Sequence, residues 1–266
     1  MRFFDTHAHY TDERFENCVE GGSDALIKTI FSNNVEKIIN VGVTVDNSID
    51  VCNQAAKYPE MYAAVGIHPS DCVDIADEDE EKELSRLREL LTKKDELKIV
   101  ALGETGLDYY WDKDHHDKQK RFFHNQLKLA IEFDLPVIVH DREAHGDSFE
   151  TVIQYPNVRG VFHSYSGSPE MALELVKRGW YISLSGVVSF KNAPKVKEVA
   201  AVVPRDRLLI ETDAPYLTPH PFRGKTNRSD YLVYTLNAIA EARGEDAEAL
   251  SEAIYHNSIA LFNKKI

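Results

Sequence analysis

The stretch "RFFDTHAH", residues 2–9, is the first of eight short apolar stretches, and the repetition of this pattern decides the fold. A longer polar or amphipathic segment follows each stretch. The eight stretches cover residues 2–9, 37–43, 61–69, 98–108, 135–143, 159–167, 180–186 and 207–215. Because strands that alternate with helices pair in parallel, the pattern predicts a mostly parallel sheet.

The number of repeats favours a closed (β/α)8 TIM barrel, of α/β class, over an open doubly wound sheet. The segment "HDKQKRFFHNQLKLAIEF" (116–133) illustrates the expected helices. Its apolar residues recur at intervals of three and four, as on one face of a helix: Phe122, Phe123, Leu127, Ala130 and Ile131. Because no low-complexity linker divides the chain, we predict a single domain over residues 1–266.

The composition is that of a soluble globular protein, with 43% hydrophobic and 28% charged residues. No apolar run reaches the roughly 18 residues that a membrane span needs, and Asp5 interrupts the N-terminus before a signal-peptide core forms. We therefore expect a cytoplasmic protein with no membrane partner. The three cysteines never form a CxxC pair, so neither a disulfide framework nor a thiolate zinc site is indicated.

The formal net charge of −13 argues against a broad basic surface that grips duplex nucleic acid. A polyanionic ligand would need a local site. Carboxylates that hold divalent cations can supply a local positive field in a protein that is acidic as a whole. Net charge alone does not show whether the protein binds a polyanion at such a local site.

His7 and His9 are two residues apart at the end of the first predicted strand. Side chains alternate between the two faces of a strand, so both imidazoles point the same way, as two ligands of one cation must. The alternative is a pair of polar residues that hydrogen-bond to their neighbours. Asp5 has the same parity but lies deeper, and we expect it to support the site by hydrogen bonding or to fill the barrel.

Ionisable residues also stand at the ends of four later strands. In a barrel these ends meet at one face, where active sites of this fold lie. Burying so many ionisable groups together without a cation would be costly, so the pattern predicts a metal site. These later residues are Glu104, His140, His163 and Asp213.

This set is rich enough for two divalent ions bridged by a carboxylate, rather than one. The first ion would be held by His7, His9, Glu104 and Asp213, and the second by Glu104, His140 and His163. Such ligands accept Zn, Mn, Fe, Co or Ni, and Mg where waters complete the shell. Paired ions polarise a phosphoryl or carbonyl oxygen and lower the pKa of water, which indicates hydrolysis.

Two of these carboxylates are also the candidate catalytic residues. Glu104 would bridge the ions. Asp213 has two open roles: a pure ligand, or a ligand whose second oxygen takes a proton from the attacking water.

Several motifs, in order along essentially the whole chain, resemble the TatD-type metal-dependent deoxyribonucleases and related hydrolases of the amidohydrolase superfamily. The three main ones are "FFDTHAH" (3–9), "PVIVHDREAHGD" (136–147) and "VVPRDRLLIETDAPYLTP" (202–219). Shorter pieces are "VGIHP", "ALGETGLDY", "HSYSG" and "SFKNA".

The resemblance implies a (β/α)8 barrel and gives the ligand role to the six residues already named. It also brings in His68 of "GIHP" and Asp108 of "GLDYY", which match positions near the family's site. We expect each of these two to orient a ligand or to contact substrate, with a purely structural role as the alternative.

The resemblance further implies phosphodiester hydrolysis of DNA, by an exonuclease that acts on single strands. A single strand suits aromatic faces that stack bases and a few cations that contact phosphates. Candidate contacts are Tyr109, Tyr110, Trp111, Arg142, Lys191, Asn192, Arg223, Lys225 and Arg228. The alternative is that the aromatic residues cover a barrel edge and that the basic loop at 220–230 is only solvated.

This basic loop departs from the family pattern. Many relatives have "RGKRNEP" where this chain has "RGKTNRS", so Arg228 replaces an acidic residue and Ser229 replaces a proline. The departure leaves the metal ligands untouched and affects substrate preference.

Two other functions remain open. A dinuclear barrel site also attacks carboxylic esters or amides, including aminoacyl esters on RNA. A barrel that has lost its chemistry can serve as a binding protein. No obligate protein partner is evident in the sequence.

Overall fold

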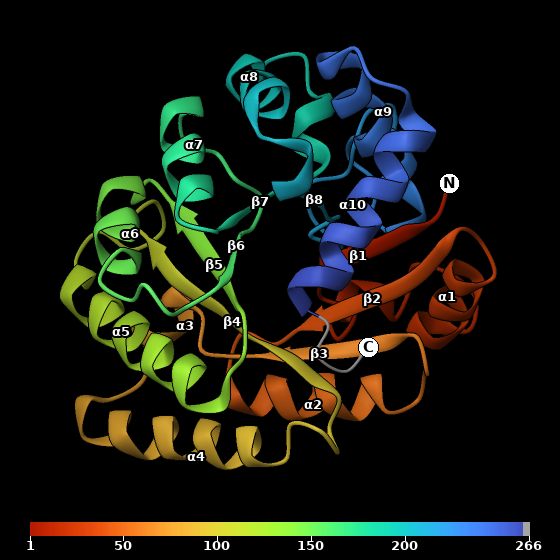
Figure 1. Ribbon diagram of the computed structural model, residues 1–266. Coiled ribbons are helices and arrows are strands. Elements are labelled where there is room, and N and C mark those ends of the chain that lie inside the picture. The colour runs from red at the N-terminus through yellow and green to blue at the C-terminus, as the bar shows by residue number, and fades with distance from the viewer. Residues whose placement is uncertain (263–266) are drawn as a thin grey trace. The chain divides into compact units, whose positions relative to one another are not determined.

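Eight parallel strands form one sheet in the computed structural model, which describes residues 1–262 (Figure 1). The strands are β1 (Phe3–Ala8), β2 (Val35–Val41), β3 (Met61–Val65), β4 (Ile99–Asp108), β5 (Val137–Arg142), β6 (Gly160–Phe162), β7 (Tyr181–Leu184) and β8 (Leu208–Ile210). They pair in sequence order, and Ala8 at the end of β1 also bridges to Ala214, just after β8. This closed order confirms the predicted (β/α)8 barrel class.

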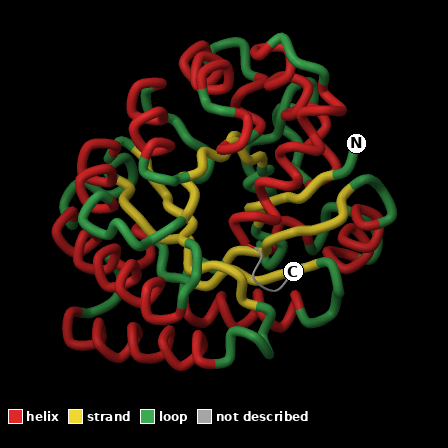
Figure 2. The backbone as a smooth tube through the Cα atoms, viewed as in Figure 1, coloured by secondary structure: helices red, strands yellow, loops and turns green. Residues whose placement is uncertain are grey.

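Helices follow every strand, as Figure 2 shows by the alternation of strand and helix along the chain. They are α1 (Gly22–Phe31), α2 (Val45–Ala55), α3 (Pro69–Cys72), α4 (Glu80–Thr92), α5 (His116–Phe133), α6 (His145–Val152), α7 (Pro169–Lys177), α8 (Pro194–Val202), α9 (Leu232–Arg243) and α10 (Ala247–Phe262). Short 3-10 turns are η1 (Glu13–Phe15), η2 (Asp77–Asp79), η3 (Gly186–Ser189), η4 (Arg205–Arg207) and η5 (Ser229–Tyr231). Within residues 1–262, no helix has the length and apolar character to cross a membrane.

The described chain divides into two compact units. The first contains residues 1–40 and 163–262, with strands β7, β8, β1 and nearly all of β2. The second contains residues 41–162, with strands β3 to β6. The prediction of a single domain over residues 1–266 stays a prediction.

Side chains at the helix starts explain where several helices begin. Thr44 accepts a hydrogen bond from the Asn47 amide at the start of α2, and Ser168 accepts one from Met171 at the start of α7. A proline follows Ser168, at a position where a helix needs no amide hydrogen. These caps satisfy amides that lack a partner inside the helix.

Helix α5 occupies the predicted residues 116–133 and packs against β4 in the second unit. Phe122, Phe123, Leu127 and Ala130 are buried, as their spacing predicts. Ile131 was expected on the same face, but 45% of it is exposed. It lies at the edge of the buried stripe, which also contains Leu129 and two glutamines.

These glutamines, Gln119 and Gln126, join α5 to the ends of two strands. Gln126 accepts a hydrogen bond from the Ile67 amide and donates to the Ile67 carbonyl, both at 2.8 Å. Gln119 accepts from the Asp108 amide at 2.8 Å and donates to the Asp108 carbonyl at 3.0 Å. Because a buried amide must be paired, each glutamine fixes the backbone beside a candidate site residue.

Two strands break their register close to predicted ligands. Strand β1 shifts against β2 between Asp5 and Ala8, and β4 shifts against β5 between Leu102 and Thr105. An extra residue in one strand turns the local side chains, and such irregularities are common next to active sites. His7 and Glu104 lie within these shifted segments.

Gly106 of β4 lies directly against the backbone of His140 in β5. A Cβ atom at Gly106 would come within 2.0 Å of the His140 carbonyl oxygen, and the φ of Gly106 is +143°. Only glycine combines this backbone conformation with such a close approach.

We expect Gly106→Ala to lower the free energy of unfolding by at least about 2 kcal/mol, since the new methyl group both strains φ and overlaps the neighbouring strand. Urea unfolding measures this. Gly179→Ala is the matched control, because Gly179 also has a positive φ of +89° but nothing lies within 4 Å of the position that a Cβ atom would take there. Equal losses in the two variants would show that the approach to His140 carries no cost.

Candidate metal centre

Ionisable side chains gather at the carboxyl ends of strands within each unit. The first unit holds a cluster that we call cluster 1: His7, His9, His163, Glu211 and Asp213. The second unit holds cluster 2: His68, Glu104, Asp108 and His140. All six predicted ligands therefore belong to one cluster or the other.

In cluster 1, three atoms converge as the ligands of one cation would. The Nε2 atoms of His7 and His9 lie 3.0 Å apart, as their shared parity predicts. The Oδ1 atom of Asp213 lies 3.7 Å from His7 Nε2 and 3.4 Å from His9 Nε2. Tetrahedral ligands at about 2.1 Å from an ion are separated by roughly 3.4 Å, so this donor set fits a metal ion.

His163 joins cluster 1 through its ring. It stacks on His7 with ring centroids 4.1 Å apart, and its Nδ1 lies 3.1 Å from Glu211 Oε1. His7, His163 and Glu211 also form a group whose ligand atoms all lie within 4.8 Å of one another. The predictions that His163 shares an ion with Glu104, and that Glu104 serves both ions, stay predictions.

Glu211 is a buried site residue that the sequence reasoning missed. It stands two residues before Asp213, at the same parity. The alternation that singled out His7 and His9 applies equally to Glu211 and Asp213. The signal was therefore present in "ETD", but only the last residue of that stretch was selected.

Asp213 follows β8 in a left-handed backbone conformation, with φ of +57°, which aspartate tolerates better than most residues. Its amide donates to the His7 carbonyl at 2.9 Å, which fixes it beside β1. Burial raises the pKa of Asp213, but a hydrogen bond from His9 and the nearby histidines outweigh it. The net pKa lies below its usual value, so the group is a carboxylate at neutral pH.

Asp5 lies fully buried beneath cluster 1 and accepts four hydrogen bonds, which confirms its expected supporting role. Oδ1 accepts from the amides of Thr212 at 3.0 Å and His7 at 3.3 Å. Oδ2 accepts from the hydroxyls of Thr212 and Ser229, both at 2.6 Å. Burial raises the pKa of Asp5 to about 6, although these hydrogen bonds oppose the increase.

In cluster 2, His140 lies between two carboxylates. Its Nδ1 is 2.6 Å from Glu104 Oε1, and its Nε2 is 3.0 Å from Asp108 Oδ2. A ring that donates its Nε2 hydrogen to Asp108 presents the Nδ1 lone pair toward Glu104. Two acceptors so close together fit a shared cation, with Asp108 orienting the ligand ring.

Asp108 also accepts hydrogen bonds from backbone amides. Burial raises its pKa, but the hydrogen bonds from His140 and from the Trp111 and Tyr110 amides outweigh it. The net pKa lies below its usual value. Asp108 is therefore a carboxylate that accepts hydrogen bonds on both oxygens.

His68 presents a hydrogen, rather than a lone pair, to cluster 2. Its Nδ1 accepts from the Ser70 amide at 3.1 Å as the cap of α3, so the neutral ring carries its hydrogen on Nε2. Burial lowers the pKa of His68, but Glu104 and Asp71 outweigh this and raise it to about 9. The cation has a hydrogen on Nδ1, which faces Asp71 instead of accepting from Ser70, and it too carries a hydrogen on Nε2. Nε2 lies 3.5 Å from Glu104 Oε1. This geometry favours the predicted contact with a ligand or substrate over a role as a metal ligand.

Comparison with known proteins identifies the family to which the chain belongs. The model of the TatD related DNase family matches residues 4–263. The chain belongs to the TatD family. It is 41% identical over 262 residues to the uncharacterized metal-dependent hydrolase YabD of Bacillus subtilis, covering 97% of this chain and 98% of the relative.

A solved structure supports the same assignment. YjjV, a TatD homologue from Escherichia coli, superimposes with a TM-score of 0.89 at 32% identity, covering 98% of each chain. Its sequence is described as an uncharacterized metal-dependent hydrolase and is 33% identical over 263 residues, which cover 98% of each protein. The present chain is accordingly a TatD-family metal-dependent hydrolase.

The predicted substrate contacts of this TatD protein differ in their surroundings. Arg142, Arg223 and Lys225 are exposed, and the Arg223 guanidinium carbon lies 3.6 Å from the centroid of the Phe190 ring. Arg228 instead forms a two-pronged ion pair with Asp230, at 2.5 and 2.8 Å. The charge of Arg228 is therefore largely neutralised, which sequence alone did not reveal.

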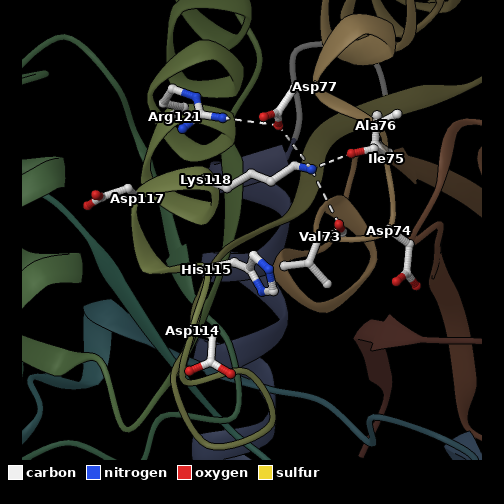
Figure 3. Close-up of a pocket in the computed structure, with 10 residues that line it drawn as sticks. All are labelled: Val73, Asp74, Ile75, Ala76, Asp77, Asp114, His115, Asp117, Lys118 and Arg121. Carbon is white, nitrogen blue, oxygen red and sulfur yellow. Dashed lines mark hydrogen bonds and ion pairs between the residues drawn. The ribbon is translucent and has the colours of Figure 1, made fainter.

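A separate hollow on the second unit of the TatD protein is lined mainly by charged residues, of which Lys118 and Arg121 pair with Asp77 (Figure 3). Lys118 points across it, donates to the carbonyls of Val73 and Ile75, and lies 3.4 Å from Asp77. Arg121 lies 3.6 Å from the same carboxylate. None of its lining residues belongs to cluster 1 or cluster 2.

Removal of the Asp5 carboxylate should destabilise the TatD protein. In Asp5→Ala the Thr212 amide and two hydroxyls lose a buried charged acceptor, which should cost at least about 2 kcal/mol in urea unfolding. Asp5→Asn keeps one acceptor oxygen, and both hydroxyls can rotate to accept from its amide, so we expect a clearly smaller loss. Equal losses in both variants would contradict this account.

Proposed function

We propose that this TatD-family hydrolase cleaves phosphodiester bonds of DNA and acts as an exonuclease on single strands. The main support is the pair of His and carboxylate clusters, each with the donor separations of a metal site in its own unit. The family description as a related DNase supports the substrate class. Under this proposal each cluster holds one divalent ion, and the donors suit Zn, Mn, Co, Ni, Fe or Mg.

Bound ions would supply a polarised phosphoryl oxygen and water with a lowered pKa. His7, His9 and Asp213 would hold the ion of cluster 1, with Glu211 and His163 beside them. Glu104 and His140 would hold the ion of cluster 2. Cluster 1 thus offers more candidate ligands than cluster 2, where Asp108 would orient the His140 ring.

The protein's own side chains would then manage protons and charge. Asp213 faces the imidazoles through Oδ1, which leaves its second oxygen to accept a proton from the attacking water. Its lowered pKa keeps the Asp213 carboxylate ionised at neutral pH. The Nε2 hydrogen of His68 would donate to a phosphate oxygen or to Glu104, which holds both groups in place.

Local cations explain how a protein of net charge −13 would bind a polyanion. Arg223 and Lys225 are exposed in the loop at 220–230, and neither is in a salt bridge among those found in residues 1–262. Arg142 is exposed beside Tyr110. A few phosphate contacts of this kind suit one flexible strand better than a broad duplex surface.

The decisive experiment is a time course on end-labelled single-stranded DNA with manganese-loaded protein. We expect a ladder that shortens from one end, and that chelator and His7→Ala both abolish. His115→Ala should cleave normally, because His115 is exposed and pairs with Asp112 outside both clusters. Metal analysis of the same samples should give two ions per chain, and fewer in His7→Ala.

Each part of the proposal has its own contrary result. Cleavage that survives complete removal of metal would disprove the mechanism. Products that begin in the middle of the strand would disprove the exonuclease assignment. No cleavage of DNA, together with rapid turnover of carboxylic esters, would favour an ester hydrolase, and no turnover at all would favour a binding protein.

The double variant Arg223→Ala/Lys225→Ala should weaken binding of single-stranded DNA while leaving turnover of bis(p-nitrophenyl) phosphate near normal. Loss of two phosphate contacts should reduce the slope of log affinity against log salt by about 1.4. Lys177→Ala/Arg178→Ala is the matched control, because these two exposed cations already pair with Glu174 on α7. Loss of small-diester turnover without a change in the salt slope would contradict phosphate contact.

A further inference from the structure

Two large aromatic side chains project from the second unit directly after β4. Tyr110 is 50% exposed and Trp111 is 69% exposed. Their rings meet edge to face with centroids 5.0 Å apart. Trp111 therefore covers little of the protein, which argues against a role in closing a barrel edge.

Arg142, at the end of the neighbouring strand β5, completes this surface. Its guanidinium carbon lies 4.2 Å from the Tyr110 centroid and 5.4 Å from the Trp111 centroid. The cation thus lies nearer to the Tyr110 ring, and the indole of Trp111, perpendicular to that ring, keeps most of its surface exposed to solvent. A positive charge beside an open aromatic face is the arrangement that binds a base and its phosphate together.

The backbone that carries these rings is fixed to cluster 2 through Asp108. The Oδ1 atom of Asp108 accepts from the amides of Tyr110 at 3.0 Å and Trp111 at 2.9 Å. Its Oδ2 atom lies 3.0 Å from Nε2 of His140. One buried carboxylate therefore sets the position of the aromatic turn relative to a candidate metal ligand.

A second set of contacts fixes the start of the turn. The Tyr109 amide donates to the Arg142 carbonyl at 2.9 Å, and its hydroxyl donates to Asp147 at 2.7 Å. The Tyr109 ring stacks on His116 with centroids 3.5 Å apart. The Tyr109 side chain therefore has a structural role, whereas the exposed rings of Tyr110 and Trp111 are available to contact a ligand.

We propose that Trp111, supported by Tyr110 and Arg142, is a stacking subsite for a nucleobase of the substrate, and that Asp108 is its positioning residue. The proposal rests on the proposed nuclease function, because it takes single-stranded nucleic acid as the ligand. The indole stacks on one base, and Arg142 contacts an adjacent phosphate. Stacking of this kind does not read sequence, since every base offers a flat face.

Tryptophan fluorescence tests the subsite without depending on cleavage. The chain has two tryptophans, and Trp180 is buried, so the difference between wild type and Trp111→Phe reports on Trp111. The ligand is a phosphorothioate oligothymidylate, which resists hydrolysis, added to metal-loaded protein. The control strand has the same backbone but no bases.

We expect the thymidylate strand to quench Trp111 and the abasic strand to leave it unchanged. Trp111→Ala should bind the thymidylate strand about tenfold more weakly and the abasic strand equally well. Trp111→Phe should retain most of the affinity, because it keeps a flat ring. Equal weakening for both strands, or no quenching by either, would overturn the subsite.

Variants of Asp108 test its positioning role. Asp108→Asn keeps an oxygen for the two backbone amides but places an NH2 group toward His140. It should preserve base-dependent quenching while lowering metal content, whereas Asp108→Ala should lose both. Quenching that survives in a folded Asp108→Ala would show that the carboxylate does not position the turn.

The outcomes for the subsite and for the nuclease are distinguishable. If the protein cleaves DNA and Trp111→Ala binds both strands like wild type, the subsite is wrong and the nuclease stands. If the protein cleaves no DNA but base-dependent quenching persists, the nuclease is wrong and the subsite stands.

Discussion

Ionisable side chains that leave water must be paired, and this requirement governs the arrangement of both clusters. Asp5, His7 and Glu104 are all buried, and each has a carboxylate, imidazole or hydroxyl partner at short range. Hydrogen bonds satisfy Asp5 completely. Imidazole nitrogens and carboxylate oxygens converge at the separations of ligands around one ion, which is why the clusters are interpreted as metal sites rather than as stabilising ion pairs.

Much of this arrangement follows from simple periodicity. The alternation of strands and helices predicted the fold class, and the spacing in residues 116–133 predicted the bounds of α5. Parity placed His7 and His9 on one side of β1, and their Nε2 atoms do meet. These features depend on the repeating geometry of helices and strands, so the spacing of residues in the sequence predicts them.

The features that were missed depend on contacts between distant residues. The stacking of His163 on His7, and the contact of its Nδ1 with Glu211, come from the side-by-side placement of strands far apart in sequence. The pairing of Arg228 with Asp230 depends on a loop conformation that no period encodes. Gln119 and Gln126 take central positions on the buried face of α5 for hydrogen bonding rather than for hydrophobicity, and apolar spacing alone does not reveal this.

The two glutamines of α5 have a further consequence, for the way the protein opens. Because Gln126 and Gln119 hold the backbone at Ile67 and Asp108, these two amides stay protected from hydrogen exchange until α5 detaches. Helix α5 and the neighbours of His68 and Asp108 therefore behave as one cooperative unit. Helix α5 contributes no side chain to cluster 2, yet it thereby determines how long the backbone around that cluster stays closed.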